Sequence, residues 1–215
     1  MKSVLITGGT VRLGKAIAER LRAEGWRVIT SSHRADAGAD IVADLAEPMG
    51  AAKLYAATLQ MLGGMPPDAL VNNAALFTGD EAAIRAVNLE APKKLTVMMA
   101  GREAGVGAVV NILDAKALDG NRLQSTASDG YHESKQALAE FTKTSAATFA
   151  ATLRVNGVAP GPVMAPTDVH EKAGEMLLDR RPTAEDVAAA VSFLLGAEAT
   201  TGVVIPVDAG QHLVS

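Results

Sequence analysis

The sequence predicts an α/β domain built on a seven-stranded, doubly wound parallel sheet with helices on both faces. Three observations support this prediction. Short β-branched runs alternate with longer Ala-rich amphipathic segments along the whole 215-residue chain. Apolar residues make up 48% of the chain but aromatic residues only 3%, which supplies the small side chains that let helices lie close to a sheet. Neither a low-complexity linker nor a repeat divides the chain, so we expect residues 1–215 to form a single domain.

Strands are expected where short apolar runs end in turn-forming residues. Several of these runs are almost continuously apolar, as is typical of parallel strands that are buried on both faces. Gly63, Gly64, Pro66 and Pro67 mark the turn into the fourth strand. In chain order, the seven expected strands span residues 3–7, 27–30, 40–43, 69–72, 108–113, 154–159 and 203–207.

Amphipathic segments between these strands predict helices at residues 13–24, 48–62, 81–101, 131–148 and 183–195. Thr183 suits the N-cap of the last helix, with Glu185 and Asp186 in its positive first turn. Residues 115–130 and 161–181 are expected to be long irregular loops. Both follow strands, and functional loops of a parallel sheet lie at the carboxyl ends of its strands, so both are placed to border a ligand.

Composition and charge exclude several classes of function. The 20 Lys and Arg residues against 24 Asp and Glu give a formal net charge of −4, the wrong sign for a protein that neutralises nucleic-acid phosphates. The chain has no Cys, which excludes disulfides and thiolate metal sites, and its four His residues lack metal-ligand spacing. No apolar run approaches about 18 residues. We therefore expect a cytoplasmic protein without a nucleic acid, a metal or a membrane as partner.

A glycine-rich turn joins the first expected strand to the first helix. It reads Thr-Gly-Gly-Thr-Val-Arg-Leu-Gly over residues 7–14. Glycines at such a turn let backbone N–H groups and the positive end of the helix dipole approach a pyrophosphate, so Gly8 and Gly14 indicate a dinucleotide site. The alternative is a tight strand-to-helix turn without a ligand, and the doubly wound context favours the nucleotide.

The residues after the second strand select between nucleotides. Ser31, Ser32, His33 and Arg34 stand there, with no carboxylate before Asp36. An acidic residue accepts from the ribose hydroxyls of NAD, whereas a guanidinium beside hydroxyls favours the 2′-phosphate of NADP. We therefore predict NADPH as the cofactor, the alternative being that His33 and Arg34 form a solvated surface pair.

Tyr131 and Lys135 are the strongest candidates for chemistry. They are four positions apart at the start of an expected helix, so their side chains lie one above the other on one helical face. A nearby ammonium favours the phenolate and brings a Tyr pKa of about 10 towards proton transfer near neutrality. A chance surface pair is the alternative. It is disfavoured because the chain has only two Tyr residues and this one follows a long loop at the carboxyl end of a central strand.

Several motifs follow one another in a recognisable order. They are Thr7-Gly8 with Arg12-Leu13-Gly14, Asn72-Asn73-Ala74, Asn88, Tyr131-x-x-x-Lys135, and Asn156 before Pro160-Gly161. This order resembles the short-chain dehydrogenase/reductase family over essentially the whole chain. The resemblance implies a Rossmann-type fold in which residues 72–74 support the central sheet and flank the cofactor. It also implies that Asn88 holds a proton-relay water beside Lys135, which binds the nicotinamide ribose as well.

Departures from the commoner family pattern indicate one branch. Arg12 replaces the middle glycine of the first turn, and Asp114 occupies the position of the catalytic serine after the fifth strand. Together with Phe77 and the His-Arg pair at 33–34, they resemble the pteridine reductase and dihydromonapterin reductase branch. The resemblance implies that Arg12, Phe77, Asp114 and Tyr131 contact a pterin-like substrate, although Phe77 is equally suited to an ordinary core.

Two features count against a pterin. Ala75 stands where pteridine reductases have a serine that contacts the ligand. Asp114 and Tyr131 are 17 positions apart, more than the family's usual spacing, so either the loop bulges or Asp114 is displaced. If it is displaced, Ser125 or Ser128 takes the serine role.

The resemblance also implies the full set of cofactor contacts. Asp44, after the third strand, is placed to contact adenine, with a solvated loop carboxylate as an equal alternative. The residues expected to bind NADPH are Gly8, Thr10, Arg12, Leu13, Gly14, Ser32, His33, Arg34, Asp44, Leu45, Asn73, Ala74, Ala75, Tyr131, Lys135, Pro160, Gly161 and Val163.

The leading hypothesis is an NADPH-dependent oxidoreductase that transfers hydride to a C=N or C=O group of a small-molecule substrate, with Tyr131, Lys135, Asp114 and Asn88 as catalytic residues. A dihydropteridine substrate, a small ketone or 3-oxoacyl substrate, and a dinucleotide-binding sensor without turnover remain as alternatives. The helices expected at 81–101 and 131–148 are apolar on more than one face. They predict a homo-oligomer, either a dimer or a tetramer.

Overall fold

The computed structural model describes residues 1–103, 105–118, 129–163 and 176–214. Within them, seven strands pair in parallel into one sheet of order β3-β2-β1-β4-β5-β6-β7. The expected seven-stranded parallel sheet is thus confirmed. The strands are β1 (Ser3–Thr7), β2 (Arg27–Ser32), β3 (Ile41–Val42), β4 (Ala69–Asn72), β5 (Gly107–Ile112), β6 (Leu153–Pro160) and β7 (Val204–Val207).

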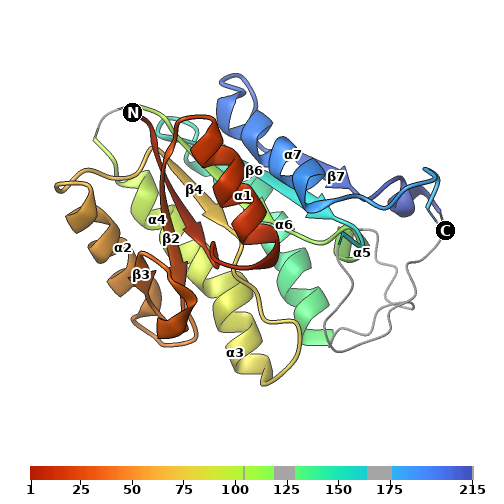
Figure 1. Cartoon of the computed structure of the whole chain (residues 1–215), viewed down its shortest axis with the longest axis horizontal. Coiled ribbons are helices and arrows are strands. Elements are labelled where there is room, and N and C mark those ends of the chain that lie inside the picture. The colour runs from red at the N-terminus through yellow and green to blue at the C-terminus, as the bar shows by residue number, and fades with distance from the viewer. Residues whose placement is uncertain (104, 119–128, 164–175, 215) are drawn as a thin grey trace.

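Helices cover both faces of this sheet. They are α1 (Arg12–Ala23), α2 (Gly50–Met61), α3 (Glu81–Arg85), α4 (Ala91–Ala100), α5 (Ala115–Leu118), α6 (Asp129–Thr148) and α7 (Ala184–Gly196). Figure 1 shows α1 and α7 side by side on one face of the sheet, with α2, α4 and α6 on the other. Two short 3-10 turns, η1 (Ala35–Ala37) and η4 (Gln211–Leu213), follow β2 and β7.

The strand residues alternate between two hydrophobic layers. Val4 and Ile6 of β1 belong to the layer that contains Ile17 of α1 and Val191 of α7. Leu5, between them, belongs to the layer formed with α2 and α4. Successive side chains of a strand point to opposite faces, so a strand that is apolar at nearly every position is covered by helices on both sides. This explains why all five residues of β1 are buried.

The strand order creates a binding position beside β1. The chain runs outward from β1 to β2 and β3, and then returns to the other side of β1 with β4. At such a reversal the loops that follow the two neighbouring strands diverge, and ligands bind in the crevice at the carboxyl ends of the strands. The turn after β1 and the loop after β4 therefore border this position.

The helix expected over residues 81–101 is interrupted. Between α3 and α4 the chain forms a π-helical turn, η2 (Ala86–Glu90), in which the N–H of Ala91 donates to the carbonyl of Ala86. Pro92 causes the interruption because it has no N–H for the carbonyl of Asn88, four residues earlier, and its ring crowds that carbonyl. The widened turn therefore falls at Asn88.

The loop expected over residues 115–130 is shorter than predicted, because helices occupy both of its ends. It begins with helix α5, because the carboxylate of Asp114 accepts a hydrogen bond of 2.9 Å from the N–H of Lys116 and caps the turn. Helix α6 begins at Asp129, two residues before its expected start. At the last helix, the expected cap is confirmed: Thr183 and Asp186 form a reciprocal capping box.

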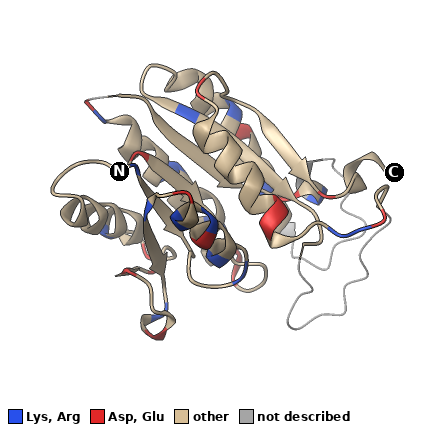
Figure 2. Cartoon of the chain, turned by 45° about the horizontal axis from the view of Figure 1, so that its top comes forward, with Lys and Arg blue, Asp and Glu red and all other residues tan. Residues whose placement is uncertain are grey.

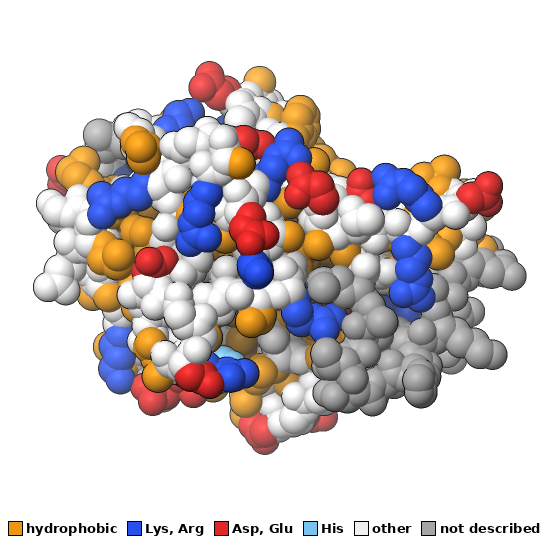
Figure 3. Space-filling view, in the orientation of Figure 1, with side chains coloured by type: hydrophobic (Ala, Val, Ile, Leu, Met, Phe, Trp, Pro, Cys, Tyr) orange, Lys and Arg blue, Asp and Glu red, His pale blue; other side chains and the backbone are white. Residues whose placement is uncertain are grey.

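Charged side chains lie mainly on the helices and the connecting loops, and the strands carry few of them (Figure 2). On the face shown in Figure 3, acidic and basic side chains are interspersed. No helix in the described part of the chain is both long and apolar enough to cross a bilayer.

Candidate active site

The turn after β1 is shaped by glycines. Gly8 has a φ of +64°, and a Cβ at Gly14 would lie 2.1 Å from the carbonyl oxygen of Gly8. Position 14 therefore accepts only glycine without a backbone shift. The N-terminus of α1 has neither a side-chain cap nor an acidic residue in its first turn. Its positive end is consequently open to an anion.

Asn73 joins this turn to the loop after β4. Its amide Nδ2 donates to the carbonyls of Thr7 (2.9 Å) and Gly8 (3.1 Å). In return, the hydroxyl of Thr7 accepts from the N–H groups of Asn73 and Ala74, each at 3.0 Å. Four hydrogen bonds thus hold the ends of β1 and β4 together, which places the expected cofactor residues Gly8, Asn73 and Ala74 at one edge. Of the remaining expected contacts there, Arg12 and Ala75 are exposed, and Thr10 and Leu13 are half-buried.

Arg34 lies in the turn after β2 with a partner that sequence reasoning missed. Its Nε and Nη2 donate to the two carboxylate oxygens of Asp36, at 3.0 and 2.7 Å. Ser32 accepts from the N–H of Arg34 at 3.1 Å, and His33 is exposed. The hydrogen bonds and charge of Arg34 lower the pKa of Asp36, and those of Asp36 raise the pKa of Arg34.

Asp44 is exposed, and its carboxylate accepts from the N–H of Ala46 at 2.9 Å, while Leu45 is buried in the core. This is the environment of a solvated loop carboxylate, one of the two alternatives for Asp44.

Asp114 and Tyr131 are brought together. The Tyr131 hydroxyl donates to Oδ2 of Asp114 at 2.9 Å, and Oδ1 of the same carboxylate accepts from Lys116. The unusually long separation along the chain therefore does not displace Asp114. Ser125 and Ser128, the alternative candidates, lie outside the described residues.

Lys135 is buried beneath this pair, with 3% of its surface exposed. Its Nζ donates to the carbonyl of Ile112 at 2.7 Å and lies 5.7 Å from the centre of the Tyr131 ring. Burial lowers the pKa of Lys135 from 10.5 to about 8, and the negative charge of Asp114 partly opposes that change. The site thus combines a phenol, a carboxylate and a buried ammonium whose pKa lies closer to neutrality than that of an exposed Lys.

Two aromatic rings flank Tyr131. The ring of Phe77 is 4.8 Å from it, tilted by 55°, and Phe77 is 36% exposed. A partly exposed ring beside the phenol fits a substrate contact better than an ordinary core position. His132, the next residue of α6, also packs edge-on against Tyr131, with its buried ring at 5.5 Å. Two adjacent positions of this turn of α6 are therefore both buried.

Asn88 makes side-chain contacts that differ from those expected. Its amide oxygen accepts from the N–H of Leu76, and its nitrogen donates to the carbonyl of Leu76 and to the hydroxyl of Ser134. Ser134 in turn donates to the carbonyl of Tyr131 at 2.6 Å. Asn88 therefore ties the loop that carries Phe77 to the helix that carries Tyr131. A relay water at Asn88 stays a prediction.

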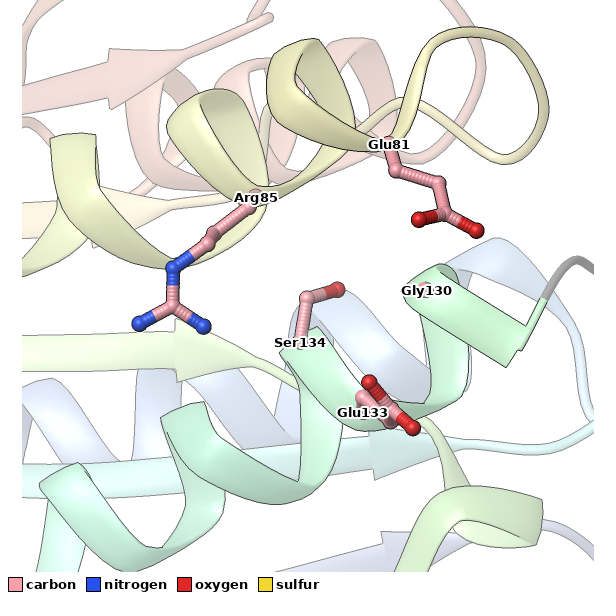
Figure 4. Close-up of a pocket in the computed structure, with 5 residues that line it drawn as sticks. All are labelled: Glu81, Arg85, Gly130, Glu133 and Ser134. Atoms are coloured by element: carbon pink, nitrogen blue, oxygen red, sulfur yellow. The ribbon is translucent and has the colours of Figure 1, made fainter.

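Ser134 also lines a pocket of about 110 Å³ between α3 and α6, together with Glu81, Arg85, Gly130 and Glu133. Figure 4 shows Glu81 and Arg85 on one helix and the other three residues on the other. The reacting groups Asp114, Tyr131 and Lys135 are not among its lining residues.

Buried amides connect the central strands with α6. Asn72 of β4 donates to Asn111 of β5 at 2.8 Å, and Asn111 donates to Thr142 of α6 at 2.9 Å. Asn72 was expected to support the sheet, and this contact agrees with that role. Asn111 and Thr142 were missed, although a polar residue inside an apolar strand was the available signal.

The end of β6 is held against the end of β7. The N–H of Gly161 donates to the carbonyl of Val207 at 3.0 Å, and a Cβ on Gly161 would lie 2.6 Å from that of Asp208. Pro160 and Val163 beside it are half-buried. These residues lie at the same carboxyl edge as the turn after β1, because all strands run parallel.

A doubly wound parallel sheet with a glycine-rich first turn, and with a phenol, an amine and a carboxylate at the same edge, defines a dinucleotide-dependent oxidoreductase. The family model described as short chain dehydrogenase matches residues 2–177, and the chain belongs to this family.

Individual relatives match over nearly their full lengths. Levodione reductase of Leifsonia aquatica is 30% identical over 97% of this chain and 93% of its own. Pteridine reductase 1 of Leishmania tarentolae is 29% identical over 97% of this chain and 96% of its own. Among solved structures, FolM alternative dihydrofolate reductase 1 from Brucella canis, complexed with NADP, superposes with a TM-score of 0.85 at 31% identity, covering 100% of this chain and 95% of that one.

Proposed function

We propose that the protein is an NADPH-dependent reductase that delivers a hydride and a proton to a C=N or C=O bond. Bound NADPH would supply the hydride, and the remaining roles fall to side chains of the protein. The observation that carries the proposal is the hydrogen bond from Tyr131 to Asp114 beside the buried Lys135. These three groups supply a proton donor, a partner that orients it and a cation that stabilises the phenolate.

Tyr131 is the proposed proton donor. When hydride adds to carbon, the adjoining nitrogen or oxygen takes the proton of the Tyr131 hydroxyl, and the electron pair of the broken O–H bond stays on the phenolate. The ammonium of Lys135 favours that phenolate electrostatically. With its pKa at about 8, Lys135 is largely protonated at neutral pH, the form that this role requires.

The first turn fits the pyrophosphate of a dinucleotide. The contact that a Cβ at Gly14 would make shows how closely the backbone is packed there, and the start of α1 has no side chain that competes for an anion. Arg34, Ser32 and His33 would hold the 2′-phosphate that distinguishes NADPH from NADH. The NADP in the structure of the Brucella protein supports this choice.

A dihydropteridine is the proposed substrate. Phe77 beside Tyr131 offers a face on which a flat ring can stack, and Asp114 can pair with its ring nitrogens and amino groups. The names of two relatives, a pteridine reductase and an alternative dihydrofolate reductase, point the same way.

A small ketone or 3-oxoacyl substrate is the second candidate. Ala75 removes one expected hydrogen bond to a pterin, and levodione reductase is among the relatives. A sensor without turnover has no chemical need for the Tyr131 and Lys135 pair, which disfavours that alternative.

Two further properties belong to the proposal. Val97 of α4 is 53% exposed, but a single exposed apolar side chain is ordinary, so the expected assembly rests on the sequence pattern of the two long helices. We expect a homodimer or homotetramer in the cytoplasm. A monomer mass from light scattering at micromolar concentration would contradict the assembly.

The test of the proposed function is the oxidation of NADPH, followed by absorbance, in the presence of a dihydropteridine, a small ketone or a 3-oxoacyl thioester. Multiple turnovers with the dihydropteridine as the preferred substrate would support the proposal. Tyr131→Phe should lower kcat by about 10² to 10⁴, the usual contribution of a positioned proton donor, while NADPH still binds. Absence of turnover with every substrate, with NADPH bound, would favour the sensor.

A further inference from the structure

The loop between β2 and β3 holds an anion at the position proposed for the 2′-phosphate. Both carboxylate oxygens of Asp36 accept hydrogen bonds from Arg34, from Nε at 3.0 Å and from Nη2 at 2.7 Å. These two nitrogens form one side of the guanidinium fork, and such a pair of parallel N–H donors is also what recognises phosphate oxygens. The carboxylate therefore occupies an edge of Arg34 that a phosphate would use.

The position of Asp36 is fixed by the ends of its loop. At the start, the hydroxyl of Ser32 accepts from the N–H of Arg34 at 3.1 Å. At the end, the carboxylate of Asp40 accepts from the N–H of Thr30 at 2.8 Å and from its hydroxyl at 2.7 Å. The short turn η1, with Asp36 at its centre, lies between these two anchors. The backbone that carries Asp36 is thus held at both ends of the loop, which keeps its carboxylate within reach of Arg34.

We propose that Asp36 competes with the 2′-phosphate for Arg34 and so limits the preference of the protein for NADPH over NADH. This inference rests on the proposed function, in which Arg34 binds the 2′-phosphate. A phosphate that approaches Arg34 must displace the Asp36 carboxylate from the Nε and Nη2 edge. Otherwise it must bind the remaining N–H groups of the guanidinium while the negative carboxylate stays bound to the other edge and repels it. NADH, which has a hydroxyl at the same position, meets neither obstacle.

The expected effect is moderate because the pair is exposed. The side chains of Arg34 and Asp36 are 60% and 71% exposed, so water screens their attraction and the repulsion between the two anions. Salt screens both further. Competition at such a site changes affinity by about threefold to tenfold, and the change diminishes as ionic strength rises.

The test compares Asp36→Asn with the unchanged protein by titrating each with NADPH and with NADH. Asn keeps the size of the side chain and removes its charge. We expect the Kd for NADPH to fall by about threefold to tenfold and the Kd for NADH to stay within about twofold, with the gain reduced at high salt. Glu47→Gln is the matched control, since Glu47 is another exposed carboxylate paired with a cation, Lys53, at 3.0 Å. It should change neither Kd.

A second variant separates this inference from the proposed function. If Arg34→Ala weakens NADPH no more than NADH, the proposed role of Arg34 is wrong and the role of Asp36 falls with it. If Arg34→Ala weakens NADPH selectively while Asp36→Asn weakens NADPH binding or leaves it unchanged, Arg34 keeps its role and only the competition is overturned. In a protein that already carries Arg34→Ala, Asp36→Asn should raise the affinity for NADPH less than it does alone, because the guanidinium for which the two anions compete is gone.

Discussion

The first turn and the catalytic segment lie at the same edge of the sheet but are built in different ways. The turn after β1 depends on the backbone: Gly8 and Gly14 give close approach, and Asn73 holds two strand ends through their carbonyls. The catalytic segment depends on side chains that carry charge or a mobile proton, namely Asp114, Tyr131 and Lys135. The turn therefore responds to changes in volume, and the catalytic segment to changes in charge.

Gly14→Ala tests the steric half of this comparison and should have the larger effect on stability. The new Cβ would lie 2.1 Å from the Gly8 carbonyl oxygen and 2.6 Å from Nδ2 of Asn73, so the turn must shift. We expect the free energy of unfolding to fall by about 3 kcal/mol and NADPH binding to weaken, measured by urea denaturation and by titration.

The matched control is Gly196→Ala. Gly196 ends α7, and nothing lies within 4 Å of its Cβ position. The same substitution there should leave stability unchanged or raise it slightly. Equal effects at the two positions would break the steric account of the turn.

Ser134→Ala tests whether the catalytic segment can be altered without the turn. The substitution removes a buried hydroxyl that accepts from Asn88 and donates to the carbonyl of Tyr131. The free energy of unfolding should therefore fall by about 1 to 2 kcal/mol. Because the turn is untouched, we expect the Kd for NADPH to stay within about twofold while kcat falls. Thr144→Ala, which removes an exposed hydroxyl of the same helix, is the control and should be nearly neutral.

Ala209→Gly should have the smallest effect, with the opposite sign. Ala209 has a φ of +56°, a left-handed conformation that disfavours every residue except glycine. Replacement by glycine should raise the free energy of unfolding by up to about 1 kcal/mol. Ala56→Gly, in the exposed middle of α2, should lower it by about 1 kcal/mol. Thermal denaturation of the two variants is the measurement. If the left-handed conformation of Ala209 matters, the two changes in the free energy of unfolding have opposite signs; if only the flexibility of glycine matters, both variants are less stable.

Much of the fold was predictable because hydrophobic pattern and turn chemistry are local properties. The alternation of apolar runs predicted all seven strands of the observed sheet, and the Gly-rich turn predicted the tight start of α1. The π-turn at Asn88 was missed. Its cause, Pro92, is visible in the sequence, but proline near a helix start is also an ordinary first-turn residue.

The candidate site was predictable only where chain position determines the contact. Lys135 follows Tyr131 by one helical turn, so their proximity could be derived. The contact between Asp114 and Tyr131 was an open question, because the course of the loop between them could not be derived from residue pattern. The pairs Arg34–Asp36 and Asn88–Ser134 were missed for different reasons. The first depends on a surface side-chain conformation, and the second on the packing of two helices.

The central claim is that Asp114, Tyr131 and Lys135 act as one electrostatic unit, and the pH dependence of kcat/KM tests it most directly. The folded-state pKa of Lys135 is about 8, and the ammonium is the active form, so kcat/KM should be constant below that pH and fall as pH rises through it. Asp114 raises the pKa of Lys135, so Asp114→Asn should move this fall to lower pH.

The same Asp114→Asn substitution should lower kcat by a factor of about 10² or more at neutral pH. Ser125→Ala and Ser128→Ala should leave kcat close to that of the unchanged protein. The account is contradicted if Asp114→Asn is fully active with an unshifted pH profile, or if Ser128→Ala is inactive while its fold and NADPH binding are intact.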